Sequence, residues 1–334
     1  MRFAWRALWS PVRAAAWCVL ALLVCTMVVR AEAPESLRKI VVIGASVSDG
    51  FGVRLRTAQQ DGRSVVVGVD MRTLLQAAAR EPDTRVTSHA TSMYFSDPAR
   101  FARESVRQAL EDRPSLVLAV DWLFWNAYGI GGTRGPMPKN CDDRMALLER
   151  GLSELEPLVR SGVPIVLGDL PDMQSAIGGG MISQAMVPDP ECLARLNARI
   201  RTWCADRPTV MLVDLSDLVR RVLDGKPVRA CNRDWCETDL GPLLQRDRLH
   251  PTLNGTMAVV AAALEAADRG TGGAASKAFD LDPGTIRARI GTVAAQGAAA
   301  KDAANAAERP AVRRTSEDPR AQPAAAGSGS NPSP

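Results

Sequence analysis

The stretch IVVIGASVSDG (residues 40–50) begins as an apolar run and ends in a loop of small residues that carries Ser46. A short run rich in Val and Ile, without alternation of polar and apolar residues, is typical of a strand that is buried on both faces. The Gly and Ser residues that follow it are typical of a loop. The stretch therefore predicts a buried strand whose carboxyl end opens into a loop with a hydroxyl group.

Four further apolar runs follow along the chain, and helical patterns lie between them. The predicted strands are 39–43, 85–88, 116–120, 164–167 and 210–213. Apolar residues spaced by three and four predict helices, including 102–110, 145–159, 193–203 and 253–267. Strands that alternate with helices favour right-handed crossovers and a parallel sheet. We therefore expect a three-layer α/β/α fold with a parallel, five-stranded, flavodoxin-like sheet.

Polar residues follow the ends of four predicted strands. Ser46 follows the first strand, and His89 and Ser92 follow the second. Asp121 follows the third strand, and Asp169 follows the fourth. In open α/β sheets the ligand crevice lies outside the carboxyl ends of the strands. The sequence therefore predicts a site at this edge of the sheet.

A second segment, DRLHP (residues 247–251), places Asp247 three residues before His250, one of two histidines in the chain. Serine hydrolysis needs a hydroxyl, an imidazole that takes its proton, and a carboxylate that fixes the imidazole tautomer. Pro251 disfavours helix at His250, so we expect this histidine on a loop. Ser46, His250 and Asp247 are therefore the candidate nucleophile, base and acid.

Alternatives to this interpretation remain open from the residues alone. Ser48 is an alternative nucleophile, and Asp239 is an alternative acid. In a purely structural interpretation, Ser46 caps a helix after the first strand, and His250 is a surface or capping residue.

The two segments resemble the blocks of the SGNH (GDSL-like) hydrolase family, over roughly 38–268. The family's first block, Gly-Asp-Ser-hydrophobic-x-x-Gly, is matched by 44–50 with Ala45 in place of Asp. Its last block, Asp-x-x-His-Pro, is matched by 247–251. By position, the resemblance implies the same three catalytic residues, Ser46, His250 and Asp247, on a three-layer fold without a metal or organic cofactor.

The two middle blocks of the family, which supply a Gly and an Asn as oxyanion donors, match poorly. No glycine lies in 88–93 after the second strand, and 121–126 lacks the Gly-x-Asn-Asp pattern. The candidate oxyanion or substrate-binding groups are therefore the Ser46 backbone N–H and the side chains of Asp121, Asn126 and Ser92. Nearby aromatic residues are either pocket walls or core: Trp122, Phe124 and Trp125.

The two ends of the chain differ in composition from its centre. Arginines precede an apolar run over 14–29, and Ala-Glu-Ala follows at 31–33. The run is shorter than the ~20 residues of a spanning helix, so the pattern predicts a signal peptide over 1–31 and a periplasmic or secreted protein. An uncleaved membrane anchor is the alternative. We expect a hydrolase domain over 36–269 and an Ala/Pro/Gly-rich tail over 270–334. The tail is expected to be largely disordered, with an isolated helix at 282–295.

Five cysteines remain after the predicted signal peptide: Cys141, Cys192, Cys204, Cys231 and Cys236. In an oxidising compartment they allow two disulfides and one free thiol. Cys231 with Cys236 is the first pairing expected and Cys141 with Cys192 the second. A zinc site is the competing interpretation, and it is disfavoured because no histidine lies near and no paired CxxC occurs.

The formal net charge of +4 is small, and no long basic run with interleaved aromatic residues occurs in the core of the sequence. Nucleic acid is therefore not an expected partner, and membrane contact is expected only if the N-terminal segment stays uncleaved. The sequence predicts an exported serine esterase that hydrolyses acyl or acetyl esters of a small molecule or glycan through an acyl-enzyme on Ser46. The alternatives are an O-acyltransferase that acts on envelope polysaccharide and a catalytically weak binding protein of the same fold.

Overall fold

The computed structural model describes residues 37–58, 64–129 and 137–308, without the side chains of 58 and 297–308. The predicted signal peptide, 1–31, and the end of the predicted tail, 309–334, lie outside the described residues. Within the described ranges, no helix is both long and apolar enough to cross a membrane.

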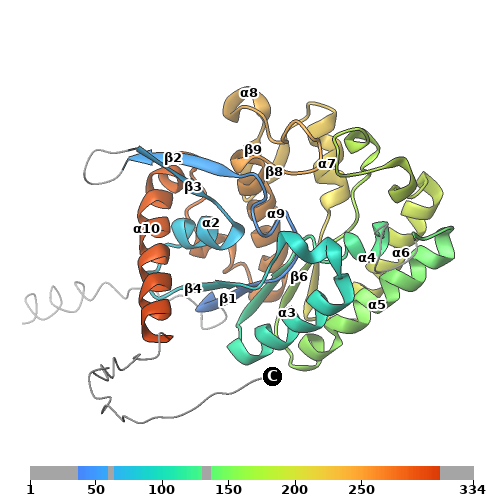
Figure 1. Cartoon of the computed structure of the whole chain (residues 1–334), viewed down its shortest axis with the longest axis horizontal. Helices are drawn as coiled ribbons and strands as arrows, with labels where there is room; N and C mark the ends of the chain where they lie inside the picture. The colour runs from blue at the N-terminus through green and yellow to red at the C-terminus, as the bar shows by residue number, and fades with distance from the viewer. Residues whose placement is uncertain (1–36, 59–63, 130–136, 309–334) are drawn as a thin grey trace, which may run out of the picture.

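A five-stranded, all-parallel sheet forms the centre of the fold (Figure 1). Its order is β4-β1-β5-β6-β7, which is the flavodoxin-like arrangement in which the order of strand addition reverses between β1 and β5. The strands are β1 (Lys39–Val42), β4 (Arg85–Ser88), β5 (Leu116–Ala119), β6 (Ile165–Gly168) and β7 (Val210–Val213). The predicted fold class is confirmed, and all five predicted strands are present.

Side chains of the sheet alternate between two hydrophobic cores, one on each face. In β1, Ile40 and Val42 pack into the first core, whereas Val41 packs into the second. Because both faces are covered, strand residues are apolar on both sides, which explains the continuous apolar runs. The first core is covered by α2 (Met71–Ala78), α7 (Leu215–Leu223), α9 (Leu253–Thr271) and α10 (Pro283–Glu308). The second is covered by α3 (Pro98–Asp112), α4 (Trp125–Tyr128), α5 (Cys141–Arg160) and α6 (Pro190–Ala205).

Polar residues determine where the helices around the sheet begin. Asp70 caps α2 by accepting from the N–H of Thr73 at 2.7 Å. Thr252 caps α9, directly after His250 and Pro251, by accepting from the N–H of Gly255. A side-chain oxygen at this position satisfies an N–H that has no partner within the helix. The loop that carries His250 is thereby fixed to the first turn of α9.

Two short hairpins and several single turns were not predicted from the sequence. The first hairpin pairs β2 (Arg54–Ala58) with β3 (Ser64–Gly68), and it lies beside α10 in Figure 1. The second pairs β8 (Val228–Ala230) with β9 (Arg233–Trp235). The remaining elements are η2 (Ser92–Ser96), η3 (Gln174–Ala176), η4 (Gln184–Met186), α8 (Glu237–Leu240) and η5 (Ser276–Ala278).

The described part of the predicted tail, 270–308, is more ordered than expected: α10 contains nearly all of the helix expected at 282–295, and that helix is not isolated. Helix α10 packs against α2 (Figure 1), and the side chains of Ile286 and Ile290 are fully buried there. Phe279, just before α10, is also buried and bridges to Ala79. The segment is rich in Ala, so its apolar pattern is sparse. Its few large apolar side chains nevertheless pack against α2, and their burial offsets the cost of ordering.

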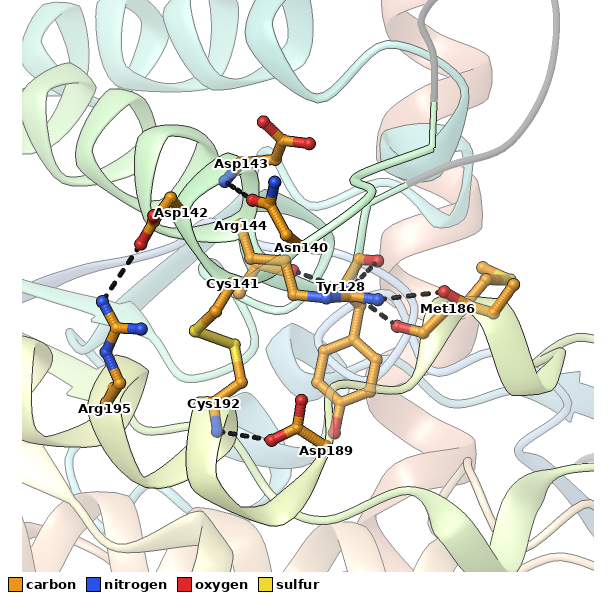
Figure 2. The surroundings of a disulfide bond; sticks show 12 residues. Tyr128, Asn140, Cys141, Asp142, Asp143, Arg144, Met186, Asp189, Cys192 and Arg195 are labelled. Carbon is orange, nitrogen blue, oxygen red and sulfur yellow. Dashed lines mark hydrogen bonds and ion pairs between the residues drawn. A yellow bond between two sulfur atoms is a disulfide. The ribbon is translucent and has the colours of Figure 1, made fainter.

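Of the two disulfides predicted from the sequence, the one between Cys141 and Cys192 is confirmed and the one between Cys231 and Cys236 is wrong. Cys141 and Cys192 are joined, with Cα atoms 5.5 Å apart, at the first turns of α5 and α6 (Figure 2). Cys231 and Cys236 are free thiols. The register of the second hairpin pairs residue 230 with 233, so Cys231 lies in its turn and Cys236 lies about 10 Å further along the ladder. That separation is too large for a disulfide.

A buried arginine lies beside this disulfide (Figure 2). The Arg144 guanidinium donates to the carbonyl oxygens of Tyr128 at 2.7 Å and of Met186 at 2.9 Å. It also donates to the carbonyl oxygens of Ala127 and Ala185. Together, the disulfide and Arg144 tie α5 to α4 and to the connection between β6 and α6. That connection forms part of the edge of the sheet described next.

Candidate active site

Ser46 lies on the loop that follows β1, at the carboxyl edge of the sheet. The loop turns back tightly, because the N–H of Asp49 donates to the carbonyl of Ala45 and that of Phe51 to the carbonyl of Ser46, both at 2.9 Å. A Cβ at Gly44 would lie 2.1 Å from Oδ1 of Asp121. Only glycine therefore allows the loop to approach this carboxylate so closely.

Asp121, just after the end of the neighbouring strand β5, holds the Ser46 loop through hydrogen bonds. Its Oδ1 accepts from the N–H of Ala45 at 3.0 Å and from the hydroxyl of Ser48 at 2.6 Å. Its Oδ2 accepts from the N–H groups of Val47 at 2.8 Å and Ser48 at 3.2 Å. Burial raises the pKa of Asp121, and these hydrogen bonds oppose that rise. The sequence predicted Asp121 as a substrate-binding or oxyanion group, but its oxygens accept from the loop, so we assign it as a positioning residue.

The three residues predicted as catalytic lie in hydrogen-bond contact. Nε2 of His250 is 3.0 Å from Oγ of Ser46, and Nδ1 is 2.7 Å from Oδ2 of Asp247. Ser46 and His250 are 204 positions apart in the sequence. An ionised carboxylate only accepts hydrogen bonds, so the proton lies on Nδ1 and Nε2 accepts from the serine hydroxyl. The imidazole is fully buried, and the ring of Phe51 packs against it with centroids 4.6 Å apart.

The Asp-x-x-His spacing is explained by bonds within a single loop. Oδ1 of Asp247 accepts from the N–H groups of Leu249 at 3.0 Å and His250 at 3.1 Å. Arg248, which lies between Asp247 and Leu249, adopts a φ of 53°, and this turn folds the chain back on itself. Partial burial acts to raise the pKa of Asp247, but the hydrogen bonds from His250 and Leu249 outweigh it and hold the pKa below its ordinary value. Asp247 is therefore ionised near neutral pH.

The alternative catalytic residues are engaged elsewhere. The hydroxyl of Ser48 is fully buried and donates to Asp121. Asp239 is exposed on α8 and accepts from the hydroxyl of Thr238. The second histidine, His89, has its Nε2 2.8 Å from a carboxylate oxygen of Asp112 on α3. Within the described residues, none of these three side chains forms a hydrogen bond or ion pair with His250.

The backbone N–H of Ser46 itself is the candidate oxyanion donor. The N–H groups of Ala45, Val47 and Ser48 all donate to Asp121. Among the described residues, that of Ser46 donates to no acceptor. An N–H on the nucleophile itself is close to the carbonyl oxygen of a bound ester. The part of the chain that the structure describes has no cluster of three His, Cys, Asp or Glu side chains that could hold a metal ion.

The side chains of Asn126 and Ser92 were predicted near the oxyanion, and the structure does not bring their donors there. The amide of Asn126 donates to the hydroxyl of Tyr94 at 3.2 Å and to the carbonyl of Trp122 at 3.1 Å. The hydroxyl and N–H of Ser92 both donate to Asp49, at 2.6 and 2.8 Å. Asn126 therefore braces the second core, and Ser92 ties the loop after β4 to the loop after β1.

An apolar cavity of about 70 Å³ lies beside Ser46. Its walls come from the ends of β5 and β6, from α7 and α9, and from the residues on either side of His250. Besides Ser46, its polar lining side chains are those of Asp121 and Asp169. Asp169 accepts from the N–H and hydroxyl of Ser216 at 2.8 and 2.9 Å, so both carboxylates are already satisfied.

The three aromatic residues predicted beside the site separate in the structure. Phe124 lines the cavity. Trp122 is fully buried in the second core, where its indole N–H donates to the carbonyl of Gly151 at 3.2 Å. Trp125 packs edge-on against Phe124, with ring centroids 5.0 Å apart, and it does not line the cavity.

Comparison with known proteins gives similarity to solved structures alone. No family model and no curated protein matches the chain. A catalytic mutant of an acetylxylan esterase from Geobacillus stearothermophilus is 19% identical with a TM-score of 0.40, over 68% of this chain and 93% of that one. A protein described as a GDSL-like lipase from Parabacteroides merdae is 14% identical with a TM-score of 0.42, over 69% and 95%. LAE5, an α/β hydrolase from a Lake Arreo metagenome, is 16% identical with a TM-score of 0.39, over 67% and 94%. At these values the similarity alone determines neither the activity nor the substrate of this chain.

Proposed function

We propose that this protein is an exported SGNH-like serine esterase that hydrolyses carboxylic esters through an acyl-enzyme on Ser46. The observation that carries the proposal is the continuous hydrogen-bonded series from the Ser46 hydroxyl through His250 to Asp247. A nucleophile in contact with a base that a third group orients is the arrangement that activates a serine.

The geometry gives each group a defined step in this reaction. Oγ of Ser46 attacks the ester carbonyl carbon while Nε2 of His250 takes its proton, and Asp247 stabilises the resulting imidazolium. The carbonyl oxygen becomes an oxyanion that accepts from the N–H of Ser46. When the tetrahedral intermediate collapses, the C–O bond to the alcohol breaks and His250 gives its proton to the departing oxygen. Water then attacks the acyl-enzyme by the same route, which releases the acid and returns the proton to Ser46.

Export is part of the proposal and has two independent supports. The first is the predicted signal peptide over 1–31. The second is the disulfide between Cys141 and Cys192, because such bonds persist in oxidising compartments and are rare in the cytosol. N-terminal sequencing of protein from a non-cytoplasmic fraction should find a mature chain that begins near Glu32 or Pro34. An intact Met1 in a membrane fraction would show an anchored protein instead.

The decisive experiment is active-site labelling of the purified protein with a fluorophosphonate, followed by mapping of the modified residue. We expect a single adduct on Ser46, accompanied by loss of hydrolysis of a p-nitrophenyl ester. The matched control is Ser153→Ala, which removes an exposed hydroxyl of α5 that donates to the carbonyl of Arg150. This variant should label like the wild type. Failure to label Ser46, together with no turnover of any ester, would leave a binding protein as the better assignment.

An acyltransferase would form the same acyl-enzyme, so labelling does not distinguish it from an esterase. A product assay with an acyl donor and a panel of glycans does. We expect free acid to be the main product. Acylated glycan in excess over free acid at millimolar acceptor would make the transferase the primary function.

A further inference from the structure

The cavity beside Ser46 has the chemistry of an aliphatic binding site. Helix α7 contributes four apolar side chains to it, and α9 contributes Ala258 and Val259. Leu249 and Pro251, on either side of His250, also line it, so it lies on the catalytic side of the loop. The four α7 side chains are Leu215, Leu218, Val219 and Val222.

The polar groups of the cavity disfavour a polar or charged occupant. Asp121 and Asp169 are its two carboxylates, and both accept from other groups of the protein. Asp121 accepts four hydrogen bonds and Asp169 accepts three, so a hydroxyl or amino group on an occupant would find at most one unused acceptor site on these carboxylates. A carboxylate on an occupant would lose its hydration in an apolar setting beside two buried carboxyl groups, which is costly.

Two glycines keep the cavity small by letting backbones meet behind it. A Cβ at Gly168 would lie 2.0 Å from the carbonyl oxygen of Val120 and 2.6 Å from Leu215. A Cβ at Gly255 would lie 1.9 Å from the carbonyl oxygen of Leu243. The ends of β5 and β6 and the start of α9 are therefore in direct contact with their neighbours, and the lining has little room to give way.

The volume sets the length of chain that fits. An apolar cavity of about 150 Å³ in another protein holds benzene, which has six carbons. By the same ratio, a cavity of about 70 Å³ holds about three non-hydrogen atoms. We propose that the cavity binds the acyl half of the ester, and that this half is a short, uncharged aliphatic chain of about two to four carbons. This inference rests on the proposed function, because it assigns the occupant to the acyl group bonded to Ser46.

The test is the dependence of kcat/KM on acyl length, measured with p-nitrophenyl acetate, butyrate, hexanoate and octanoate. We expect similar values for acetate and butyrate and a value for octanoate at least about tenfold lower than for butyrate, because the longer chain cannot be buried. The p-nitrophenyl hemisuccinate, which is close to butyrate in length but charged, should also be at least about tenfold poorer. An octanoate value equal to or above that of butyrate would overturn the inference.

A variant locates the effect in the cavity. Leu218→Ala removes a buried wall side chain and should raise the octanoate-to-butyrate ratio by at least about fivefold, through the added space. Leu152→Ala, which truncates an equally apolar, buried residue in the second core, should leave the ratio unchanged. If Leu218→Ala does not fold, the half-buried Val219→Ala replaces it. An unchanged ratio in a folded cavity variant would show that the acyl chain binds elsewhere.

Failure of the inference is distinguishable from failure of the proposed function. A protein that labels on Ser46 and turns over esters, but prefers octanoate, is an esterase with a different acyl site. A protein that neither labels nor turns over any of the four esters is not an esterase, and both proposals then fall.

Discussion

The two halves of the candidate site are held in different ways. The His250 half is local: Asp247 binds the imidazole and the N–H groups of residues 249 and 250 within a single loop. The Ser46 half is held from a distance, by a carboxylate on the adjacent strand that lies 73 to 76 positions away. The His250 half forms a short motif that can be recognised in the sequence. The support of the Ser46 half exists only because β5 lies beside β1. Substitutions in the two halves should therefore differ in what they cost the fold.

The largest expected effect is on chemistry alone. Ser46→Ala and His250→Ala should each reduce kcat/KM for p-nitrophenyl butyrate by at least about 10⁴-fold, because either change removes the nucleophile or its base. The melting temperature of Ser46→Ala should stay close to that of the wild type. His89→Ala, which removes the other histidine, is the matched control and should keep most of the activity. Near wild-type turnover by Ser46→Ala, with contaminating esterases excluded, would contradict the assignment.

Asp121→Asn tests the long-range half. The substitution replaces one carboxylate oxygen, which accepts from N–H groups of the loop, by an NH₂ group that cannot accept. The buried N–H groups that lose their acceptor cost about 1–3 kcal/mol each in free energy of unfolding. We expect kcat/KM to fall about 10- to 100-fold, together with a clear drop in melting temperature, because the loop around Ser46 is released. Asp112→Asn, a carboxylate that contacts His89 away from the loop, is the control. Full activity in Asp121→Asn would show that the loop keeps its shape without this support.

Truncation after Gly273 asks how far the support of the Ser46 half extends. Helix α10 packs on α2, and the first residue of α2, Met71, donates its N–H to the carbonyl of Ser48. Removing α10 uncovers the surface that Ile286 and Ile290 bury, at about 1.5–3 kcal/mol per side chain. A large drop in melting temperature is expected, measured by circular dichroism. A cut after Glu308 serves as the control: it removes only residues whose composition predicts disorder, and it should leave the melting temperature unchanged.

The smallest effect is the acid dependence of the local half. The pKa of Asp247 is lower in the folded protein than its ordinary value of 3.8. Its contribution to the free energy of unfolding is therefore present above that value and is lost as the pH falls through the folded-state pKa. Urea unfolding should show that the wild type has a higher free energy of unfolding than Asp247→Asn at pH 7. This difference should be smaller at pH 3. A difference in free energy of unfolding that increases on acidification would mean that the folded protein does not stabilise Asp247 as the carboxylate.

Regular local patterns explain most of what the sequence predicted well. Strands buried on both faces have continuous apolar runs, and helices that cover one face repeat every three or four residues, so the architecture could be inferred before the structure. The Asp-x-x-His spacing was informative for a similar reason, because its bonds form between residues three positions apart. The Ser46 loop was found from its position after the first strand.

Other features depend on contacts between segments far apart in the chain. Asn126 was predicted near the oxyanion because it was the available asparagine, yet the helical turn of α4 directs its amide to Tyr94 and Trp122. Cys231 and Cys236 are close in sequence, but the hairpin register separates them. Helix α10 has a weak pattern because its large apolar residues are few, and its buried isoleucines become informative only where α10 packs against α2.

The sequence by itself determined the alternation of strands and helices and the identity of Ser46, Asp247 and His250 as the candidate triad. Only the tertiary structure decided that Asp121 supports the Ser46 loop, that Cys231 and Cys236 stay unpaired, and that a small apolar cavity lies beside the nucleophile. The physical reason is the separation along the chain of the residues that interact. Periodicity and short hydrogen-bonded loops are set by neighbours in the chain, whereas supports, disulfides and cavities form where the order of the strands brings distant residues together.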